Sequence, residues 1–360
     1  MNDECVKLTT YLGERDRADG GFLADALLDC YQRHGFRASV LLRGALGFGI
    51  GHHLRSDRLL TLSEDLPVIS VAVDTRLRIE AALPELRELT TKGLVTLERA
   101  RLVTERLHSA DVADRTGEHT KLTVYVGRKQ RIADSPAYVR VVETLHRLGV
   151  AGATVLLGVD GTLHGTRQRA TFFGRNADVP MMIISIGTSA TTAAALDALG
   201  DQIEDPLATI ERVQILKRDG EQSAGVPVVA DTDGSGLNVW QKLMIYTGEQ
   251  SRDDDGQPIY QQLVRGLREA GAAGATCIRG IWGYHGAHQP HGDRFFSVRR
   301  HVPVVTVVVD APERIRELYP IVDRLTRQTG LVTSEVVPAF RATGSGIRRG
   351  GLRIADPFSD

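Results

Sequence analysis

The sequence predicts an α+β protein made of three tandem copies of one β-α-β-β-α-β unit, and three observations support this. The segment at residues 7–13, KLTTYLG, returns as KLTVYVG from Lys121 and as KLMIYTG from Lys242. These starts lie 114 and 121 residues apart, so each copy has the size of a domain. Each copy also repeats its glycine spacing and carries a proline-led apolar run, at 67–74, 180–187 and 303–310.

The hydrophobic pattern of the first copy predicts its elements in order. A strand is expected over residues 6–12, and the helix over 21–34 has one apolar face and ends at Gly35. The remaining elements are a strand at 37–42, a glycine-rich loop, the proline-led strand at 67–73, a helix at 76–90 and a strand at 94–100. This last strand is matched by 207–213 and 331–337, and Pro136 and Pro258 begin the equivalent first helices.

This order predicts the ferredoxin-like split βαβ arrangement, an antiparallel sheet with two helices on one face. Because a triplicated small domain commonly replaces a homotrimer, we expect an intramolecular pseudo-trimer with binding sites between the copies. The expected divisions are domains at 1–104, 121–216 and 240–340, a polar linker at 105–120, a mobile linker at 217–239, and a loosely ordered tail at 341–360.

Composition excludes several classes of partner. The 360 residues carry a net charge of −1, which gives no overall field to attract nucleic acid or an anionic membrane. The three cysteines show no ligand-like spacing, and Cys277 takes a strand position that Leu41 and Val155 hold in the other copies. The N-terminus is polar and acidic, and no apolar run reaches the ~18 residues of a membrane span. We therefore expect a monomeric cytoplasmic protein without a nucleic-acid partner.

The loop after the second strand combines glycine, arginine and histidine in every copy. Glycine lets backbone N–H groups approach a ligand closely, and arginine binds phosphate through paired hydrogen bonds. The arginine and histidine side chains of the three loops are Arg55, Arg58, His52 and His53, then His164, Arg167, Arg169 and Arg175, then His285, His288, His291, Arg294, Arg299, Arg300 and His301. Over residues 51–58, 164–178 and 285–301, each loop carries one aspartate against them, Asp57, Asp178 or Asp293. This composition predicts an anion-binding surface, with phosphate as the expected target.

Other interpretations of these loops are weaker. Residues 47–51, GFGIG, superficially match a dinucleotide-binding motif, but a charged loop and a strand follow instead of a helix. His285, His288 and His291 could ligate a transition metal, although Pro290 opposes the helix that would set their geometry. A solvated loop is the simpler interpretation, so no metal site is assigned. No nucleophile or acid–base pair recurs, and we expect no enzyme activity.

The middle copy lacks polar residues that the two outer copies share. Arg128 replaces Glu14 and Glu249, Leu157 replaces Arg43 and Arg279, Thr171 replaces Arg58 and Arg294, and Gly187 replaces Asp74 and Asp310. Its apolar positions are retained, which indicates a packing role with a relaxed ligand role. The cleft between copies one and three is therefore expected to be the most complete.

The motifs of the outer copies also resemble those of a known family. Copy one contains Tyr11-x-Gly13-Glu14, Arg43-Gly44-Ala-Leu-Gly47-Phe48-Gly49, His52-His53 and Leu62-Ser63-x-Asp65-Leu66-Pro67. Copy three contains Tyr246-x-Gly248-Glu249, Arg279-Gly280-Ile-Trp282-Gly283-Tyr284 and Phe295-Phe296 before Val302-Pro303. In these features the chain resembles the PII-like bacterial domains called domain of unknown function family 190. Copy two is similar in its strands and glycines only.

The resemblance implies ferredoxin-like domains that trimerise and act in signalling. Relatives in the wider superfamily bind adenine nucleotides or other effectors between subunits, and a long loop then switches a partner protein. An adenine nucleotide, with or without magnesium, is the implied effector. The implied ligand-binding residues are Glu14, Arg43, Gly44, Gly47, Phe48, Gly49, His52, His53 and Arg58 of copy one, with Glu249, Arg279, Gly280, Trp282, Gly283, Tyr284, His285 and Arg294 of copy three. Members of this family are often associated with fluoride-channel-type membrane proteins, which suggests such a channel as the regulated partner.

Two other functions stay open on the sequence. One is a metal-binding protein of the trimeric, copper-tolerance type that uses the histidine loops. The other is an adaptor without a ligand, whose loops bind a protein partner directly.

Overall fold

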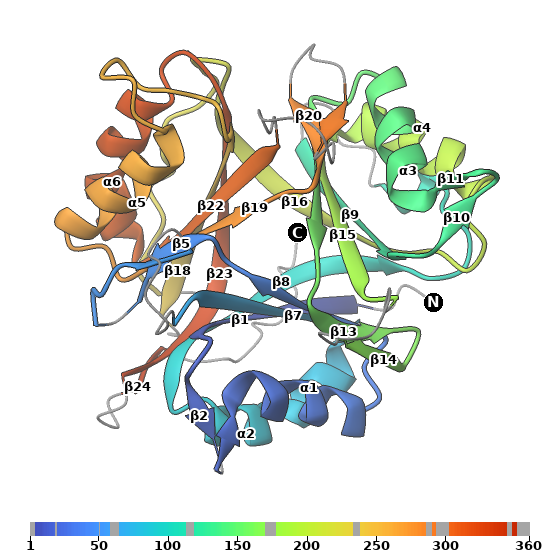
Figure 1. The fold of residues 1–360 in the computed structure, drawn as a ribbon, viewed down its shortest axis with the longest axis horizontal. Helices are drawn as coiled ribbons and strands as arrows, with labels where there is room; N and C mark the ends of the chain where they lie inside the picture. The colour runs from blue at the N-terminus through green and yellow to red at the C-terminus, as the bar shows by residue number, and fades with distance from the viewer. Residues whose placement is uncertain are drawn as a thin grey trace.

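The computed structural model describes residues 4–18, 20–49, 51–57, 65–112, 119–169, 178–232, 238–285, 290–292, 302–343 and 348–350. Within these residues the protein is a mixed α/β structure of three similar units, with six α-helices and mostly antiparallel strands (Figure 1). The units, called repeats one, two and three from here on, surround a common centre. Their helices lie on the outside of the molecule.

The main elements follow the same order in every repeat. Repeat one consists of β1 (Glu4–Gly13), α1 (Leu23–Arg33), β4 (Ala38–Arg43), β7 (Pro67–Thr75), α2 (Arg76–Leu89) and β8 (Lys92–Val103). Repeat two consists of β9 (His119–Gly127), α3 (Ala137–Arg147), β12 (Gly152–Leu157), β15 (Pro180–Thr188), α4 (Ser189–Gly200) and β16 (Leu207–Arg218). Repeat three consists of β18 (Val239–Gly248), α5 (Ile259–Glu269), β19 (Ala275–Arg279), β22 (Pro303–Asp310), α6 (Pro312–Leu325) and β23 (Leu331–Thr343).

Short elements connect or extend these. They are β2 (Arg17–Ala18), β3 (Gly21–Phe22), β5 (Leu46–Phe48), β6 (Arg55–Ser56), the 3-10 turn η1 (Ser109–Asp111), β10 (Arg131–Ile132), β11 (Ser135–Pro136), β13 (Asp160–Leu163), β14 (Thr166–Arg169), β17 (Glu221–Gln222), β20 (Trp282–His285), β21 (His291–Gly292) and β24 (Arg348–Gly350).

The first strand of each repeat is the centre of its antiparallel sheet. In repeat one β1 pairs with both β7 and β8, and β4 pairs with the far side of β7. The orders β12-β15-β9-β16 and β19-β22-β18-β23 repeat this pattern in the other two repeats. Both faces of the central strands are covered, which explains why their sequences read as nearly continuous apolar runs.

Most predicted elements lie within two or three residues of the observed ones, but the last strand of each repeat is longer than predicted. β8 ends at Val103, β16 at Arg218 and β23 at Thr343. β16 therefore enters the segment expected as the second linker, while β23 and β24 occupy the first part of the expected tail. Pro136 and Pro258 are the N-cap residues of α3 and α5, one position before the first helical residue.

Four apolar cores hold the molecule together. Each pair of helices packs on the outer face of its own sheet, and the inner faces of all three sheets form a shared central core. Leu27, Val141 and Leu263 are fully buried anchors of the three outer cores. The central core contains side chains such as Tyr125 and Val305, which no single repeat could bury on its own.

Two sets of strand pairs join the repeats in a closed cycle. The long last strands meet one another, β8 with β16, β16 with β23, and β23 with β8. Each repeat also lends a short strand to the sheet edge of a neighbour, as β13 pairs with β4, β20 with β12 and β5 with β19. Every sheet edge that faces a neighbour is thus paired, which removes exposed edge strands at the joints.

Six buried charges lie where the three sheets meet. Lys7, Lys121 and Lys242 come from the first strands, and Glu98, Glu211 and Glu335 come from the last strands. Their side chains are at most 7 % exposed. Each lysine pairs with the carboxylate of its own repeat and with that of a neighbour. We call this set the central charge ring.

The distances in the central charge ring are those of close ion pairs. Lys7 Nζ lies 2.5 Å from Glu98 and 2.6 Å from Glu211, and Lys242 Nζ lies 2.9 Å from Glu98. Burial alone would favour neutral carboxyl groups, but the three ammonium groups outweigh it and hold the pKa of Glu98 well below its usual range. The pKa of Glu335 is lowered in the same way by Lys121 and Lys242, against the effect of burial. The ring is therefore ionised and has no net charge at neutral pH.

Replacing Lys121 by Met should destabilise the protein by about 3–5 kcal/mol, because three buried carboxylates would then face two ammonium groups. Urea unfolding of the purified chain measures this loss. The exposed Lys129→Met is the matched control and should change the free energy of unfolding by no more than about 0.5 kcal/mol. A loss below about 1 kcal/mol for Lys121→Met would contradict this role of the ring.

The central charge ring should also make stability depend on acid pH. Because the folded-state pKa values of Glu98 and Glu335 are lowered, their contribution is complete above the unfolded pKa and is lost as pH falls through the folded values. The free energy of unfolding should therefore fall steeply below about pH 4. In Glu335→Gln the same titration should have a shallower slope, and identical slopes in the two proteins would rule out this effect.

Candidate functional site

The Glu14 and Arg43 pair lies between repeats one and two. The Arg43 guanidinium donates to the Glu14 carboxylate at 3.0 Å, and both side chains are more than one third exposed. They border a hollow of about 720 Å³ whose far wall carries Asp160 and Arg169 of repeat two. The sequence prediction that Arg43 contacts phosphate thus concerns an arginine that already has a carboxylate partner.

Arg279 and Glu249 form the corresponding pair in repeat three. Arg279 Nε lies 3.0 Å from Glu249, and its Nη1 pairs with Asp57 from the loop of repeat one. The Tyr260 hydroxyl is a further partner at 3.3 Å. Burial opposes the charged guanidinium, but these three neighbours outweigh it and raise the pKa of Arg279. Arg279 therefore ties the loop of repeat one to repeat three.

The predicted loop glycines allow neighbouring repeats to approach one another. The N–H groups of Gly44 and Gly280 donate to the carbonyl groups of Pro67 and Pro303 within their own repeats, each at 2.7 Å. The next amide in the chain crosses the joint, since Ala45 N–H donates to Cys277 O at 2.8 Å. The N–H groups of these two glycines are thus already in use, and we do not count them as donors to a ligand.

A side chain at Gly47 or Gly283 would collide with the neighbouring repeat. A Cβ at Gly47 would lie 2.6 Å from Ala275 O, and one at Gly283 would lie 2.2 Å from Ala153 O. Gly283 also has φ +150, which side-chain-bearing residues rarely adopt. These glycines therefore let β5 and β20 pair with their neighbours.

The aromatic residues among the predicted sites have different surroundings. Phe48 is buried in β5 and stacks on His52 with ring centroids 5.7 Å apart. Tyr284 donates its hydroxyl proton to Val150 O of repeat two at 2.9 Å. Trp282 is half-buried beside it in β20 and packs against the core of repeat two. The contacts of Tyr284 and Trp282 join repeat three to repeat two, so the aromatic residues of β20 have a packing role that the sequence did not reveal.

Some predicted residues lie outside the described residues. They are Arg58, Arg175, His288, Arg294, Arg299, Arg300, His301 and the side chain of His291. His285 is described and lines a small hollow between repeats two and three.

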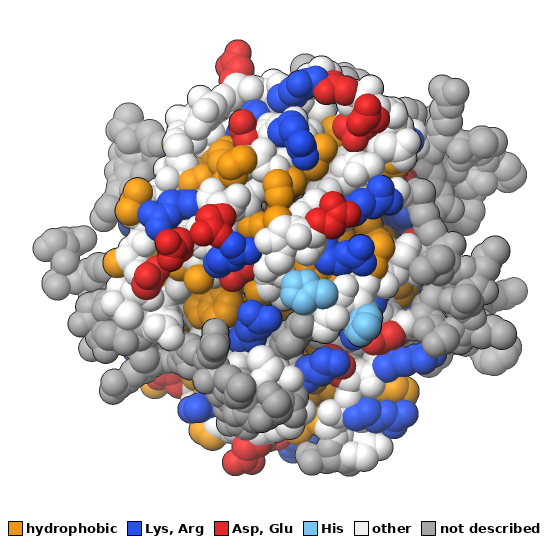
Figure 2. All heavy atoms as spheres, turned by 90° about the vertical axis from the view of Figure 1, so that its left-hand side faces the viewer, with side chains coloured by type: hydrophobic (Ala, Val, Ile, Leu, Met, Phe, Trp, Pro, Cys, Tyr) orange, Lys and Arg blue, Asp and Glu red, His pale blue; other side chains and the backbone are white. Residues whose placement is uncertain are grey.

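The hollow between repeats one and three has a different chemical character, and we call it the one–three cleft. It encloses about 100 Å³ and contains Gly49, His53, Arg55 and Lys92 of repeat one. Repeat three contributes Trp240 and Arg341, together with the edge of β19. Figure 2 shows the side of the molecule on which β5 lies in Figure 1, where basic and acidic side chains are interspersed and histidines lie near the middle of the face. The basic residues of the one–three cleft are therefore not part of a uniformly basic surface on this side of the molecule.

Two donors in the one–three cleft have no acceptor. Trp240 Nε1 and Arg341 Nε are both buried and have no hydrogen-bond partner among the described residues. Arg341 also forms no ion pair within that part of the chain. Arg55 forms a close ion pair with Asp65 at 2.7 Å, whereas Lys92 lies 3.8 Å from Asp16, a longer contact. An unpaired buried donor costs about 1–3 kcal/mol, which an acceptor such as a phosphate oxygen would offset.

The equivalent positions of the other repeats lack this combination. Counted from the aligned lysines of the first strands, Trp240 corresponds to Cys5 and His119. Counted from the glutamates of the last strands, Arg341 corresponds to Thr104 and Lys217, and Lys217 is paired with Asp323 at 2.7 Å. The sequence analysis missed Arg341 because it ended the last strand of copy three at residue 337, and it missed Lys92 because it began the last strand of copy one at residue 94. Trp240, directly before the repeated lysine segment, was the available signal.

Three repeated α/β units around a charged centre, with hollows at their joints, define a tandem-repeat protein of pseudo-trimeric outline. Comparison with known families identifies it further: the chain belongs to domain of unknown function family 190, described as an uncharacterised ACR, whose model matches residues 5–102, 119–215 and 240–339. The predicted family and its three tandem copies are confirmed.

The similar curated proteins are each about one repeat long. A UPF0166 protein of Aquifex aeolicus is 32% identical over 95 residues, which are 26% of this chain and 88% of that protein. A second one from this bacterium is 35% identical over 68 residues, 19% of this chain and 71% of that protein. One from Methanocaldococcus jannaschii is 30% identical over 91 residues, 25% of this chain and 83% of its own length. This chain thus joins in one polypeptide what its relatives carry singly.

Among the described helices, none is both long enough and apolar enough to cross a lipid bilayer.

Changing Gly283 to Ala should destabilise the protein by about 2 kcal/mol or more, because the new methyl group meets Ala153 O and the backbone is strained. Gly256→Ala is the matched control in repeat three: Gly256 has φ +75 but open space around its Cβ position, so only about 1 kcal/mol is expected. Thermal unfolding of both variants compares the two losses. Equal losses would show that the joint between repeats tolerates the methyl group.

Proposed function

We propose that this protein is a PII-like sensor that binds a small phosphate-containing effector, an adenine nucleotide by our inference, in the one–three cleft. The observation that carries the proposal is that Trp240 and Arg341, whose Nε1 and Nε donors are buried without acceptors among the described residues, line the same cleft as the basic residues of repeat one. The protein would act by binding and not by catalysis.

The strand order supports the fold part of this proposal. Each repeat has a β-α-β-β-α-β order with the first strand between the third and the fourth, which is the order of a ferredoxin-like unit. The closed cycle of strand pairs makes the chain equivalent to a trimer of such units. Relatives of one-repeat length are consistent with a trimer of separate chains as the parent arrangement.

The size and chemistry of the one–three cleft limit the effector. A hollow of about 100 Å³ is smaller than the roughly 300–1,000 Å³ of a typical small-molecule pocket. It can enclose a phosphate group or one aromatic ring, so the rest of a nucleotide would extend out of the cleft. Arg55 and Arg341 suit phosphate oxygens, while Trp240 and Phe48 offer apolar ring surfaces.

The same residues offer a route from binding to signalling. Arg55 is paired with Asp65, and residues 55 and 65 are the two sides of the loop that follows β5. An anion that binds Arg55 would compete with Asp65 for the guanidinium and would change the conformation of the loop. Arg279 holds the same loop through Asp57, so repeat three would sense the change. We propose that this loop presents the signal to a partner protein, for which a channel of the fluoride-exporter type is a candidate by family association.

Thermal unfolding with AMP, ADP, ATP and cyclic nucleotides, with and without magnesium, tests the effector. An effector at 100 times its dissociation constant should stabilise the protein by about 2.7 kcal/mol. Arg341→Gln should weaken binding of that nucleotide about 10- to 100-fold, because a hydrogen bond to a charged group contributes about 1.5–3 kcal/mol.

Arg218→Gln is the matched control. Arg218 lies at the end of β16 and lines the hollow between repeats two and three, so its loss should leave nucleotide affinity unchanged. Equal affinities for Arg341→Gln and the unchanged chain would remove the one–three cleft from the proposal. If none of the nucleotides stabilises the protein, the result would instead favour the ligand-free adaptor.

A further inference from the structure

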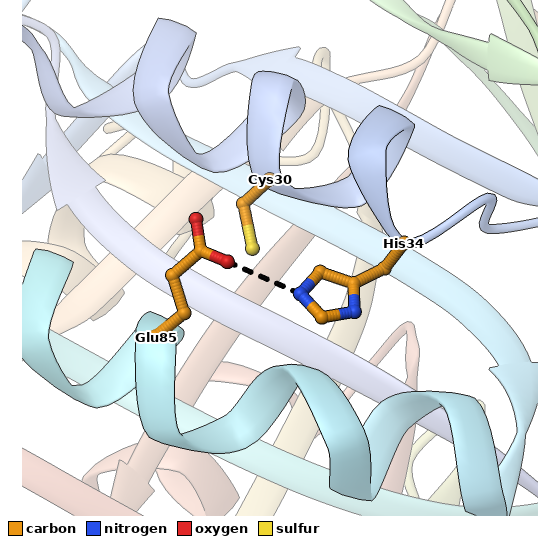
Figure 3. Close-up of side chains that lie close together, drawn as sticks. All are labelled: Cys30, His34 and Glu85. Atoms are coloured by element: carbon orange, nitrogen blue, oxygen red, sulfur yellow. Dashed lines mark hydrogen bonds and ion pairs between the residues drawn. The ribbon is translucent and has the colours of Figure 1, made fainter.

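Three potential metal ligands converge on the outer helices of repeat one. Cys30 lies on α1, His34 caps the C-terminal end of α1 one turn later, and Glu85 lies on the facing helix α2 (Figure 3). Their ligand atoms all lie within 4.8 Å of one another, and His34 Nε2 is 3.1 Å from Glu85 Oε2. The three side chains point toward one another across the gap between the helices.

The fold does not require these residues. At the equivalent positions, repeat two has Thr144, Leu148 and Ala198, and repeat three has Gly266, Ala270 and Ile321. Repeat three packs this same contact with a glycine against an isoleucine, since Ile321 lies 3.0 Å from a Cβ placed on Gly266. The helix pair is therefore stable without a thiol, an imidazole or a carboxylate at these places, and their presence in repeat one calls for a separate explanation.

We propose that Cys30, His34 and Glu85 form a binding site for a zinc ion. Thiolate, imidazole and carboxylate are the side chains that bind zinc in proteins, and three of them leave one position of a tetrahedron for water. Cys30 is fully buried, while the side chains of His34 and Glu85 are 26% and 35% exposed. The cysteine would thus lie at the base of the site and the open position at its rim.

The local electrostatics suit a divalent cation. A thiolate and a carboxylate supply two negative charges, one of which the Arg33 guanidinium offsets through its pair with Glu85, and the C-terminal end of α1 adds negative potential at His34. Arg33 pairs with the other oxygen of Glu85 and can keep that contact while Glu85 Oε2 binds the metal. A carboxylate held in this way is oriented by its outer partner, as is usual for zinc ligands.

Metal binding exchanges one proton. Burial and the neighbouring Glu85 raise the pKa of Cys30 to about 12, so the metal-free cysteine is a thiol. When Zn²⁺ binds, the thiol proton is released to solvent and the sulfur–zinc bond takes its place. No electron transfer is involved.

Another group of carboxylates, Glu98, Glu211 and Glu335, lies in the central charge ring. Three lysine ammonium groups already occupy the positions that a cation would need there. The Cys30 site is separate from both that ring and the one–three cleft, so its test does not depend on the proposed effector.

Titration of the full metal-free chain with Co²⁺, which substitutes for zinc and is coloured, tests this site. We expect one Co²⁺ per chain with the thiolate-to-cobalt charge-transfer absorption, and displacement of that absorption by Zn²⁺. The substitutions introduce the residues that repeat two has at the equivalent positions, so the variants should keep the fold. Cys30→Thr should abolish the charge-transfer absorption. His34→Leu and Glu85→Ala should weaken zinc binding at least about 10-fold.

Cys277→Val is the matched control, since Cys277 is also buried and unpaired but has a strand position that Val155 holds in repeat two. It should leave the cobalt absorption unchanged. Absence of a thiolate absorption in the unchanged chain would overturn the proposal, as would an absorption that survives Cys30→Thr. In either case the three side chains would form a hydrogen-bonded contact only.

Discussion

The central charge ring is the interaction on which the architecture depends. Each lysine pairs with the glutamate of its own repeat and with that of a neighbour, as Lys7 does with Glu98 and Glu211. In a single repeat, the lysine would therefore lack one of its two carboxylate partners. Two repeats could not form the closed cycle of ion pairs. Burying six ions costs more than an apolar core of similar size would, so the ring is better explained by specificity than by stability. Every lysine and glutamate of the ring has its partners only when three repeats assemble in this one relative arrangement.

Close approach of the backbones follows from this arrangement. With the last strands meeting at the centre, the edge strands of adjacent repeats come into hydrogen-bonding distance, and the glycines at the joints admit them. The same joints leave the hollows of the molecule between the repeats. Linking the three units in one chain then allows each joint to differ, which a trimer of identical chains cannot do.

Much of the fold could be predicted from the sequence, because the pattern of every element occurs three times in the chain. The strands, helices and glycine spacings all recur, so an ambiguity in one copy is resolved by another.

The site was predicted less well. Long-range partners decide what an arginine does, and nothing near Arg279 in the sequence indicates Asp57 as its partner. Trp240 and Arg341 lie more than 100 residues after the part of repeat one that they face. The sequence analysis considered the spacing of the cysteines alone and did not pair Cys30 with His34, one helical turn later, and Glu85 joins them only once α1 and α2 pack.

The three joints of the molecule now have three different chemistries. Between repeats one and two, Arg167 of the middle repeat lies 2.9 Å from Asp160 and also pairs with Asp29 of α1, which links the two repeats by charge beside the hollow of about 720 Å³. Between repeats two and three, Tyr284 fills the joint and satisfies its own hydroxyl. Within the described residues, the joint between repeats one and three combines the buried, unpartnered donors of Trp240 and Arg341 with the basic side chains of Arg55 and Lys92. Buried donors without a partner in that part of the chain also occur at the joint between repeats two and three, on Trp282 and Thr247. The middle repeat, which lacks the polar motif of the outer copies, forms ion pairs or hydrogen bonds at both joints that it touches, and none of its described residues lines the one–three cleft.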